Sequence, residues 1–121
     1  MFEISVKKSF SASHALHNGG MLIEELHDHA WQCEVVISAD ELDKAGVAVD
    51  FRKVDEVFDR AIESIAGRSL HETKEFANKS PSAENVAVYL YTKLTQELGN
   101  DIMRVRVWED EAHSATYYAT K

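Results

Sequence analysis

The sequence predicts an α+β fold with the element order β-β-α-α-β-β. Alternating apolar and polar residues at both ends of the chain indicate strands, and two central stretches with apolar residues every three or four positions indicate helices. Because consecutive strands pair most simply as antiparallel hairpins, we expect a four-stranded antiparallel sheet with both helices on one face. Such a sheet leaves two open edges, which subunits of an oligomer usually cover, so the pattern also predicts a homo-oligomer.

Length and composition narrow the class of protein. The 121 residues, taken as one domain spanning 1–121, are enough for a single core. The formal charge of -8 argues against a nucleic-acid surface, because phosphate contacts need clustered basic side chains. No apolar run is long enough to cross a membrane, the N-terminus lacks a signal-peptide pattern, and the single cysteine, Cys33, suits a reducing compartment. We therefore expect a cytoplasmic protein that binds neither nucleic acid nor membrane; the acidity does not exclude a small phosphorylated substrate.

Four segments alternate with the two-residue period of a half-buried strand. Residues 1–10 and 31–39 make the first two strands, with a long irregular stretch between them, and 103–109 and 115–119 make the last two. The inward faces of the first two strands carry the following apolar residues: Phe2, Ile4, Val6, Phe10, Trp31, Cys33, Val35 and Ile37.

The two helices have recognisable ends. Asp50 is the predicted N-cap of the first helix, and Gly67 is predicted to end it. Ser80 is the predicted N-cap of the second helix, with Pro81 in the first helical position, where its missing N–H does no harm. Between the helices, residues 68–79 are polar and predicted to be irregular.

Three histidines suggest a metal site. His27 and His29 are two residues apart, so in an extended chain their side chains point the same way. His14 ends an earlier strand-like run, and if the two runs pair, the three imidazoles converge. Three neutral nitrogens on zinc leave one coordination position open, as in a catalytic site. The alternative is that His27 and His29 are a polar strand start and that His14 is a loop histidine.

Other residues are weaker candidates. Glu109 shares the inward face of Val107, so it is either a buried carboxylate that anchors a ligand rich in N–H donors or the exposed end of the strand. His71 lies in the irregular segment, where binding and catalytic residues are common, although a lone loop histidine is often solvated. Glu24 and Glu25 shortly precede the histidine pair; alone, they would be a solvated pair of charges.

Five short motifs occur in order along the chain: Phe10-Ser11-Ala12-Ser13-His14, Leu26-His27-Asp28-His29, Val49-Asp50-Phe51, Pro81-Ser82-Ala83-Glu84-Asn85-Val86-Ala87 and Val107-Trp108-Glu109. In this order and at these spacings, the chain resembles the 6-pyruvoyltetrahydropterin synthase family, which includes the 6-carboxytetrahydropterin synthases, over nearly its whole length. Each motif alone is weak.

The resemblance implies both an architecture and a site. It implies the tunnelling fold, in which sheets of several subunits join into a barrel with active sites between subunits, and a homohexamer built as a dimer of trimers. It also implies zinc on three histidines and a pterin substrate. The residues concerned are His14, His27 and His29 for zinc, Glu109 for the pterin ring, and Ser82 and Ala83 beside the substrate.

The chain departs from the family pattern at three positions. Asp28 replaces the glycine of the usual His-Gly-His, which an outward-facing strand position tolerates. Ile23 stands where most members have the cysteine that acts as a base, and Cys33 is too far along the strand to replace it. Leu70 stands where an aspartate usually precedes His71.

These departures change the expected reaction. Some members of the family have a glutamate near the missing cysteine and resemble enzymes that cleave the side chain of dihydroneopterin to 6-hydroxymethyldihydropterin. Glu24 or Glu25, together with His71, would then move protons in a zinc-dependent lyase acting on dihydroneopterin or its triphosphate. The alternative is a paralogue that keeps the zinc and the pterin pocket without catalysis. A weaker alternative is a zinc hydrolase with an unrelated substrate.

Overall fold

The structure is a computed structural model. It describes residues 1–14, 17–18, 21–22, 27–99 and 101–119; for 17–18, 21–22 and 27–28 it describes the backbone alone. The elements, in chain order, are β1 (Phe2–His14), β2 (His17–Asn18), β3 (Met21–Leu22), β4 (His27–Ala39), α1 (Phe51–Glu63), the short 3-10 turns η1 (Leu70–Glu72) and η2 (Lys74–Phe76), α2 (Ala83–Leu98), β5 (Ile102–Trp108) and β6 (Ser114–Tyr118).

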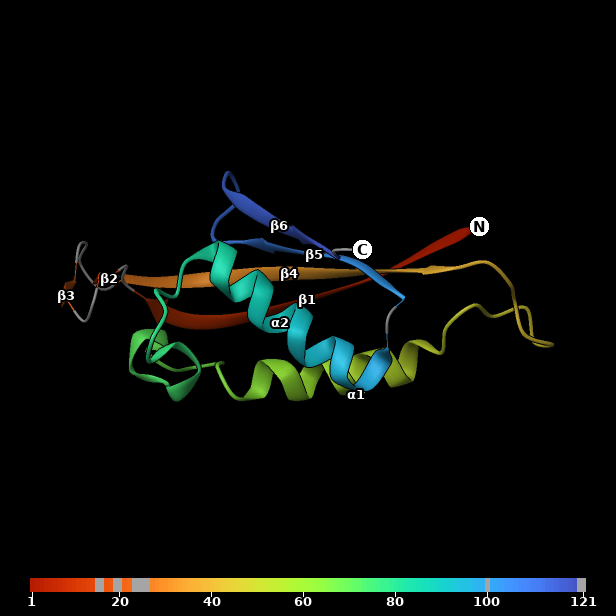
Figure 1. Cartoon of the computed structure of the whole chain (residues 1–121), viewed down its shortest axis with the longest axis horizontal. Coiled ribbons are helices and arrows are strands. Elements are labelled where there is room, and N and C mark those ends of the chain that lie inside the picture. Colours follow the sequence, from red (N-terminus) through yellow and green to blue (C-terminus); the bar gives the residue numbers. More distant parts are fainter. Residues whose placement is uncertain (15–16, 19–20, 23–26, 100, 120–121) are drawn as a thin grey trace.

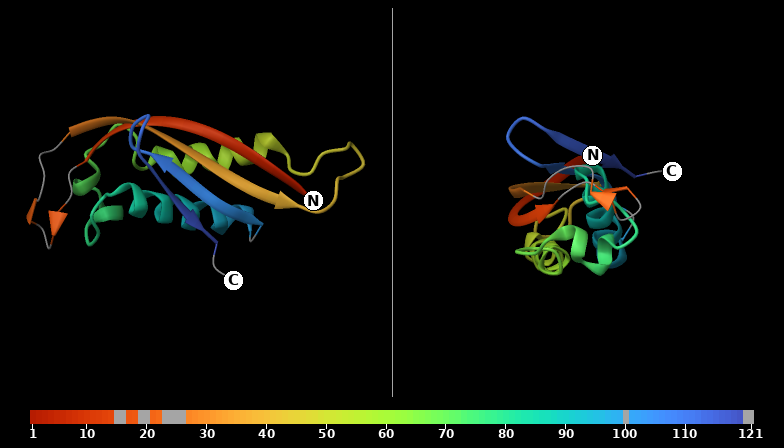
Figure 2. Two further views of the ribbon diagram at one scale, coloured as in Figure 1. Left: turned by 90° about the horizontal axis from the view of Figure 1, so that it is seen from above. Right: turned by 90° about the vertical axis from the view of Figure 1, so that its left-hand side faces the viewer.

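The main sheet has four strands in the order β1-β4-β5-β6, and all three neighbouring pairs are antiparallel. Both helices cover the same face of this sheet, and the opposite face carries no helix (Figures 1 and 2). The predicted α+β fold with the order β-β-α-α-β-β is therefore confirmed, apart from the small additional hairpin of β2 and β3. None of the helices that the structure describes is long and apolar enough to cross a membrane.

The core lies between the sheet and the helices. The inward residues of β4 from Trp31 to Ile37 are almost fully buried, as their alternation predicts. They join one hydrophobic cluster with the apolar stripes of both helices, represented by Phe58 of α1 and Leu90 of α2. Burial of these side chains fixes which face of the sheet looks inward.

The helix ends depart from the prediction in two places. Asp50 caps α1 as expected, by accepting a hydrogen bond from the Arg52 N–H, but the helix stops at Glu63 and only a turn continues to Gly67, whose φ is 70°. The prediction of Ser80 as the N-cap of the second helix and Pro81 as its first residue is wrong. The cap is Ser82, whose Oγ accepts the Asn85 N–H at 3.1 Å.

The segment between the helices is less polar than it looks in the sequence. Its two 3-10 turns bury Leu70 and Phe76 in the core. Before them, Gly67 N–H donates to the Ser11 carbonyl and Ser13 N–H donates to the Arg68 carbonyl. These bonds attach the segment to the outer edge of β1, close to the end of the strand that carries His14.

Candidate metal centre

His14 is the last residue of β1 and has a fully buried side chain; no other polar or charged side chain that the structure describes is as buried. Its Nδ1 lies 2.7 Å from the carbonyl oxygen of Pro81. A carbonyl only accepts hydrogen bonds, so Nδ1 carries the hydrogen and donates it. This bond fixes the ring and leaves Nε2 as the nitrogen with a lone pair available for a metal.

His29 reaches the same place from β4. In the β1–β4 register it pairs with Ala12, and opposite residues of an antiparallel pair point to the same face. The two imidazole rings are therefore neighbours, with centroids 5.0 Å apart, and both rest edge-on against the buried indole of Trp31. Trp31 forms an apolar wall beside the two rings.

Glu109 completes the cluster from the other end of the chain. It follows β5, and its backbone N–H donates to the His113 carbonyl across the hairpin that leads to β6. Its Oε1 lies 2.6 Å from His14 Nε2 and 3.8 Å from His29 Nε2. One donor atom from each of the three residues lies within 4.8 Å of the others.

The donor set fits a divalent ion. Two imidazole nitrogens and a carboxylate oxygen are ligands that zinc accepts in catalytic sites, and the arrangement combines a buried histidine with a partly exposed carboxylate. The bond from His14 to Pro81 is the outer contact that metal-binding histidines normally make. These three residues therefore form a candidate metal site.

The 6-pyruvoyl tetrahydropterin synthase family matches residues 3–120. The chain belongs to this family.

The chain is 30% identical over 108 residues to a dihydroneopterin monophosphate aldolase of Pyrococcus furiosus, and the match covers 88% of each chain. It is 24% identical over 119 residues to a 6-carboxy-5,6,7,8-tetrahydropterin synthase of Rickettsia felis, covering 81% of this chain and 83% of that one. Among solved structures it is similar in fold to the 6-pyruvoyl tetrahydropterin synthase of Caenorhabditis elegans, with a TM-score of 0.88, 22% identity and coverage of 98% and 96%.

Some predicted site residues lie wholly or partly outside the described residues. The backbone of His27 is opposite His14 in the register, but its side chain is outside the described residues. Glu24 and Glu25 are outside the described residues altogether, as is Ile23. Within the described part of the chain, the candidate metal site therefore consists of His14, His29 and Glu109.

His71 is not one of the three clustered residues. It lies in η1, where its Nε2 is 3.7 Å from a carboxylate oxygen of the neighbouring Glu72. Its buried Nδ1 has no hydrogen-bond partner among the residues that the structure describes. Leu70, which replaces the aspartate usual in the family, is fully buried in the core, so it fills space and orients nothing.

Ser82 and Ala83 stand at the start of α2. The Ser82 hydroxyl serves as the helix cap, and Ala83 is the first helical residue and packs against the core. The Pro81 carbonyl is directed to His14 instead of into the helix, which explains why α2 begins two residues later than predicted. The same few residues thus hold both the helix start and the orientation of a candidate metal ligand.

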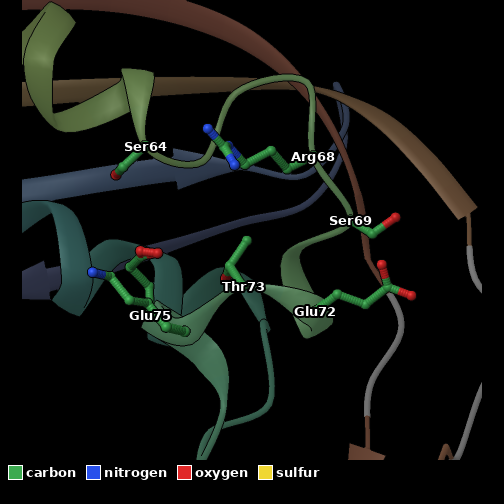
Figure 3. Close-up of a pocket in the computed structure, with 7 residues that line it drawn as sticks. Ser64, Arg68, Ser69, Glu72, Thr73 and Glu75 are labelled. Carbon is green, nitrogen blue, oxygen red and sulfur yellow. The ribbon is translucent and has the colours of Figure 1, made fainter.

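One hollow includes none of the three cluster residues in its lining. It has a volume of about 540 Å³ and lies between the end of α1 and the 3-10 turns, with Arg68, Glu72 and Glu75 among its lining residues (Figure 3). A second hollow of about 490 Å³ includes Ser13, His29 and Ser69. Because His29 lines only the second hollow, that one is the more relevant to the candidate metal site.

Two features of the site are absent from the sequence prediction. The contact between Pro81 and His14 is one, because a backbone carbonyl leaves no signal in the sequence. The closeness of Glu109 to the imidazoles is the other, although the two-residue period places Glu109 on the inward face. What remained unknown was the β4–β5 register, in which Gln32 pairs with Trp108.

Proposed function

We propose that this protein is a zinc-dependent lyase that cleaves the side chain of a phosphorylated dihydroneopterin and releases 6-hydroxymethyldihydropterin. The observation that carries the proposal is the convergence of His14, His29 and Glu109 in a member of this family. The relative in Pyrococcus furiosus, a dihydroneopterin monophosphate aldolase, favours side-chain cleavage over the synthase reaction and a monophosphate over a triphosphate.

A glutamate is available to act as the catalytic base. Structures similar in fold include variants of a Plasmodium vivax 6-pyruvoyltetrahydropterin synthase in which a catalytic glutamate is replaced by alanine or cysteine. In this chain Ile23 stands where the family usually has its cysteine, and Glu24 follows it directly. We assign the role of base to Glu24, with Glu25 as the neighbouring alternative.

The reaction balances without an oxidant or a reductant. The base removes the proton of the 2′-hydroxyl, the C2′–O bond becomes a carbonyl, and the C1′–C2′ bond breaks. Its electron pair moves toward the C6–N5 double bond of the ring, and a proton delivered to C1′ completes the hydroxymethyl group. The other product is an aldehyde that carries the phosphate. A metal ion bound at the histidines supplies Lewis acidity, which lowers the pKa of a bound hydroxyl.

Each residue has one assigned task. Glu24 removes the hydroxyl proton, His71 returns a proton to carbon, and Glu109 accepts N–H bonds from the pterin ring. Ser82 and Ala83 lie beside the substrate. Because His71 is not part of the cluster in its own chain, we assign it to the site of a neighbouring subunit, within a hexamer that pairs the open sheet edges.

The test is a product assay on the zinc-loaded protein with dihydroneopterin monophosphate. The wild type should release 6-hydroxymethyldihydropterin. The Glu24→Gln variant should lose about 10²- to 10⁴-fold in rate, because one general base is removed, and should still bind the pterin. Glu25→Gln is the comparison variant: it should keep its rate if Glu24 is the base, and a loss confined to Glu25→Gln would assign the base to Glu25 instead.

Other results of the product assay would favour a different function. Binding without any product from the wild type would favour the non-catalytic paralogue. Formation of 6-carboxytetrahydropterin from dihydroneopterin triphosphate would favour the synthase reaction instead. Sedimentation of the same sample tests the hexamer, and a monomer at micromolar concentration would remove the basis for a shared site.

A further inference from the structure

The hollow of about 490 Å³ that His29 lines differs in charge from the rest of the chain. Among the residues that the structure describes, no acidic residue lines it, although the chain has 21 acidic and 13 basic residues. Its polar lining beside His29 consists of three serines, Ser11, Ser13 and Ser69, and the arginine Arg68. Hydroxyls donate hydrogen bonds, and a guanidinium presents its N–H donors in a planar fork. This combination favours an anion with several oxygen atoms, such as a phosphate.

Arg68 has a guanidinium that is available for such an anion. Its side chain is exposed and makes no hydrogen bond or ion pair with any other residue in the part of the chain that the structure describes. The other four arginines each contact an acidic or hydroxyl side chain: Arg52, Arg60, Arg104 and Arg106. Within the described residues, Arg68 is therefore the arginine whose donors remain for a ligand.

The backbone around Arg68 is already held in place. Gly67 N–H donates to the Ser11 carbonyl at 2.6 Å, and Ser13 N–H donates to the Arg68 carbonyl at 3.0 Å. The hydroxyl oxygens of Ser13 and Ser69 lie 3.0 Å apart, so one of their two hydrogens is used in this contact and the other remains for a ligand. An anion bound here would not have to order the backbone first, which lowers the cost of binding.

Arg68 also lines the other hollow, of about 540 Å³, but that one suits an anion less well. Glu72 and Glu75 line it too, and their carboxylates would repel a phosphate (Figure 3). The acid-free hollow beside His29 is therefore the better place for an anion on Arg68.

The chemistry of the proposed substrate requires a phosphate close to the metal centre. In dihydroneopterin monophosphate the phosphate is attached at C3′, the carbon next to the C2′ whose hydroxyl loses its proton. A phosphate subsite must therefore adjoin the candidate metal ligands. The acid-free hollow meets this condition, because His29 and Arg68 both line it.

We infer that Arg68 binds the phosphate of a phosphorylated pterin in the hollow beside His29, with a hydroxyl of Ser13 or Ser69 as a further donor. Arg68 thereby selects phosphorylated over unphosphorylated substrates. This inference rests on the proposed function for its pterin, and it deepens that function by naming the residues that recognise the phosphate.

The test measures binding alone, with two stable oxidised pterins, neopterin and neopterin monophosphate, followed by pterin fluorescence. The wild type should bind the monophosphate more tightly. Arg68→Gln should weaken binding of neopterin monophosphate by about 10- to 100-fold, because hydrogen bonds between two charged groups are lost, and should leave the affinity for neopterin unchanged. The matched control is Lys74→Gln, which removes an exposed cation that lines only the other hollow and should change neither affinity.

Two results would overturn the inference while the wild type still binds pterin, which leaves the proposed function intact. One is an equal affinity of the wild type and Arg68→Gln for neopterin monophosphate. The other is an equal loss in Lys74→Gln, which would show a general effect of surface charge. If Arg68→Gln does not fold, a crystal structure of the wild type with neopterin monophosphate decides the matter, and a phosphate away from Arg68 would overturn the inference.

Failure of the wild type to bind either pterin would count against the proposed function, and the phosphate site is then tested by itself. Phosphorus NMR of inorganic phosphate is compared in the presence of the wild type and of Arg68→Gln. Line broadening that the variant abolishes supports a phosphate site at Arg68. An identical response from the two proteins would overturn it.

Discussion

Two parts of the β1–β4 ladder use the same inward face of the sheet in different ways. In the packed stretch, residues 31–37 of β4, the inward side chains are apolar and meet both helices. At the histidine end, residues 12–14 and 27–29, the same alternation brings His14 and His29 inward. Strand periodicity therefore determines which side chains come into contact. The residue types determine whether that contact stabilises the fold or forms a site.

The largest expected effect is a loss of stability after a substitution in α1, in the core that packs against residues 31–37 of β4. Phe58 of α1 is fully buried, so Phe58→Ala should lower the free energy of unfolding by about 3–5 kcal/mol, since it leaves a cavity. Urea denaturation measures this, with Phe51→Ala, at a position 55% exposed, as a control that should change stability by less than about 0.5 kcal/mol. Zinc content per folded chain should not change; a loss of zinc would show that the two parts are not separable.

The next effect separates the histidine end from the core. His29→Ala should weaken zinc binding about 100-fold or more, or about 2.8 kcal/mol, because a candidate ligand is removed. His113→Ala, which removes an exposed histidine of the β5–β6 turn, is the control. Elemental analysis after dialysis measures both. Equal zinc content in the two variants would contradict the assignment.

A smaller effect concerns Cys33, which lies in the packed stretch. Burial raises the pKa of its thiol from the ordinary 9.0 to about 12, so the folded state favours the protonated form. Below pH ~9 the thiol is protonated in both states; above it, only the unfolded chain ionises. The thiol's contribution to stability is therefore lost as the pH rises toward 12, by about 2–3 kcal/mol at pH ~11. Denaturation of the wild type should show this loss relative to Cys33→Ala, and parallel pH profiles would refute it.

The smallest effect concerns the cap of α2, next to the histidine end. Ser82→Ala should lower the free energy of unfolding by about 1 kcal/mol, because Asn85 N–H loses its acceptor. Ser82→Asp should keep most of that stability, since aspartate caps helices as well. If pterin affinity also falls in Ser82→Asp, the hydroxyl acts on the substrate, as the family resemblance implies; unchanged affinity in both variants limits Ser82 to the cap.

Much of the fold follows from periodicity, and the exceptions have physical causes. Alternation predicts the inward face of β4 but not the burial of Val36, which lies between Ser5 and Arg104 in neighbouring strands, next to a shift in register. Leu70 and Phe76 are isolated in a polar segment, so no periodicity could assign them to the core.

The candidate site was only partly predictable for a similar reason. His14 and His29 share a face through local alternation, which the sequence shows directly. The contact of His14 with Pro81 and the approach of Glu109 depend on tertiary packing. Long-range register and backbone acceptors have no local signature in the sequence.

The cluster draws its members from distant parts of the chain, and this bears on the order in which it assembles during folding. His14 and His29 belong to one pair of strands that are near each other in sequence, whereas Glu109 follows β5, after both helices. Closing a shorter loop sacrifices less chain entropy, so the first strand pair is favoured to form before β5 docks on β4. An ion available in the cell during synthesis would then meet two imidazoles first and the carboxylate last. Metal loading and completion of the sheet would be successive events. The C-terminal hairpin would then add Glu109 to a site that already holds its ion.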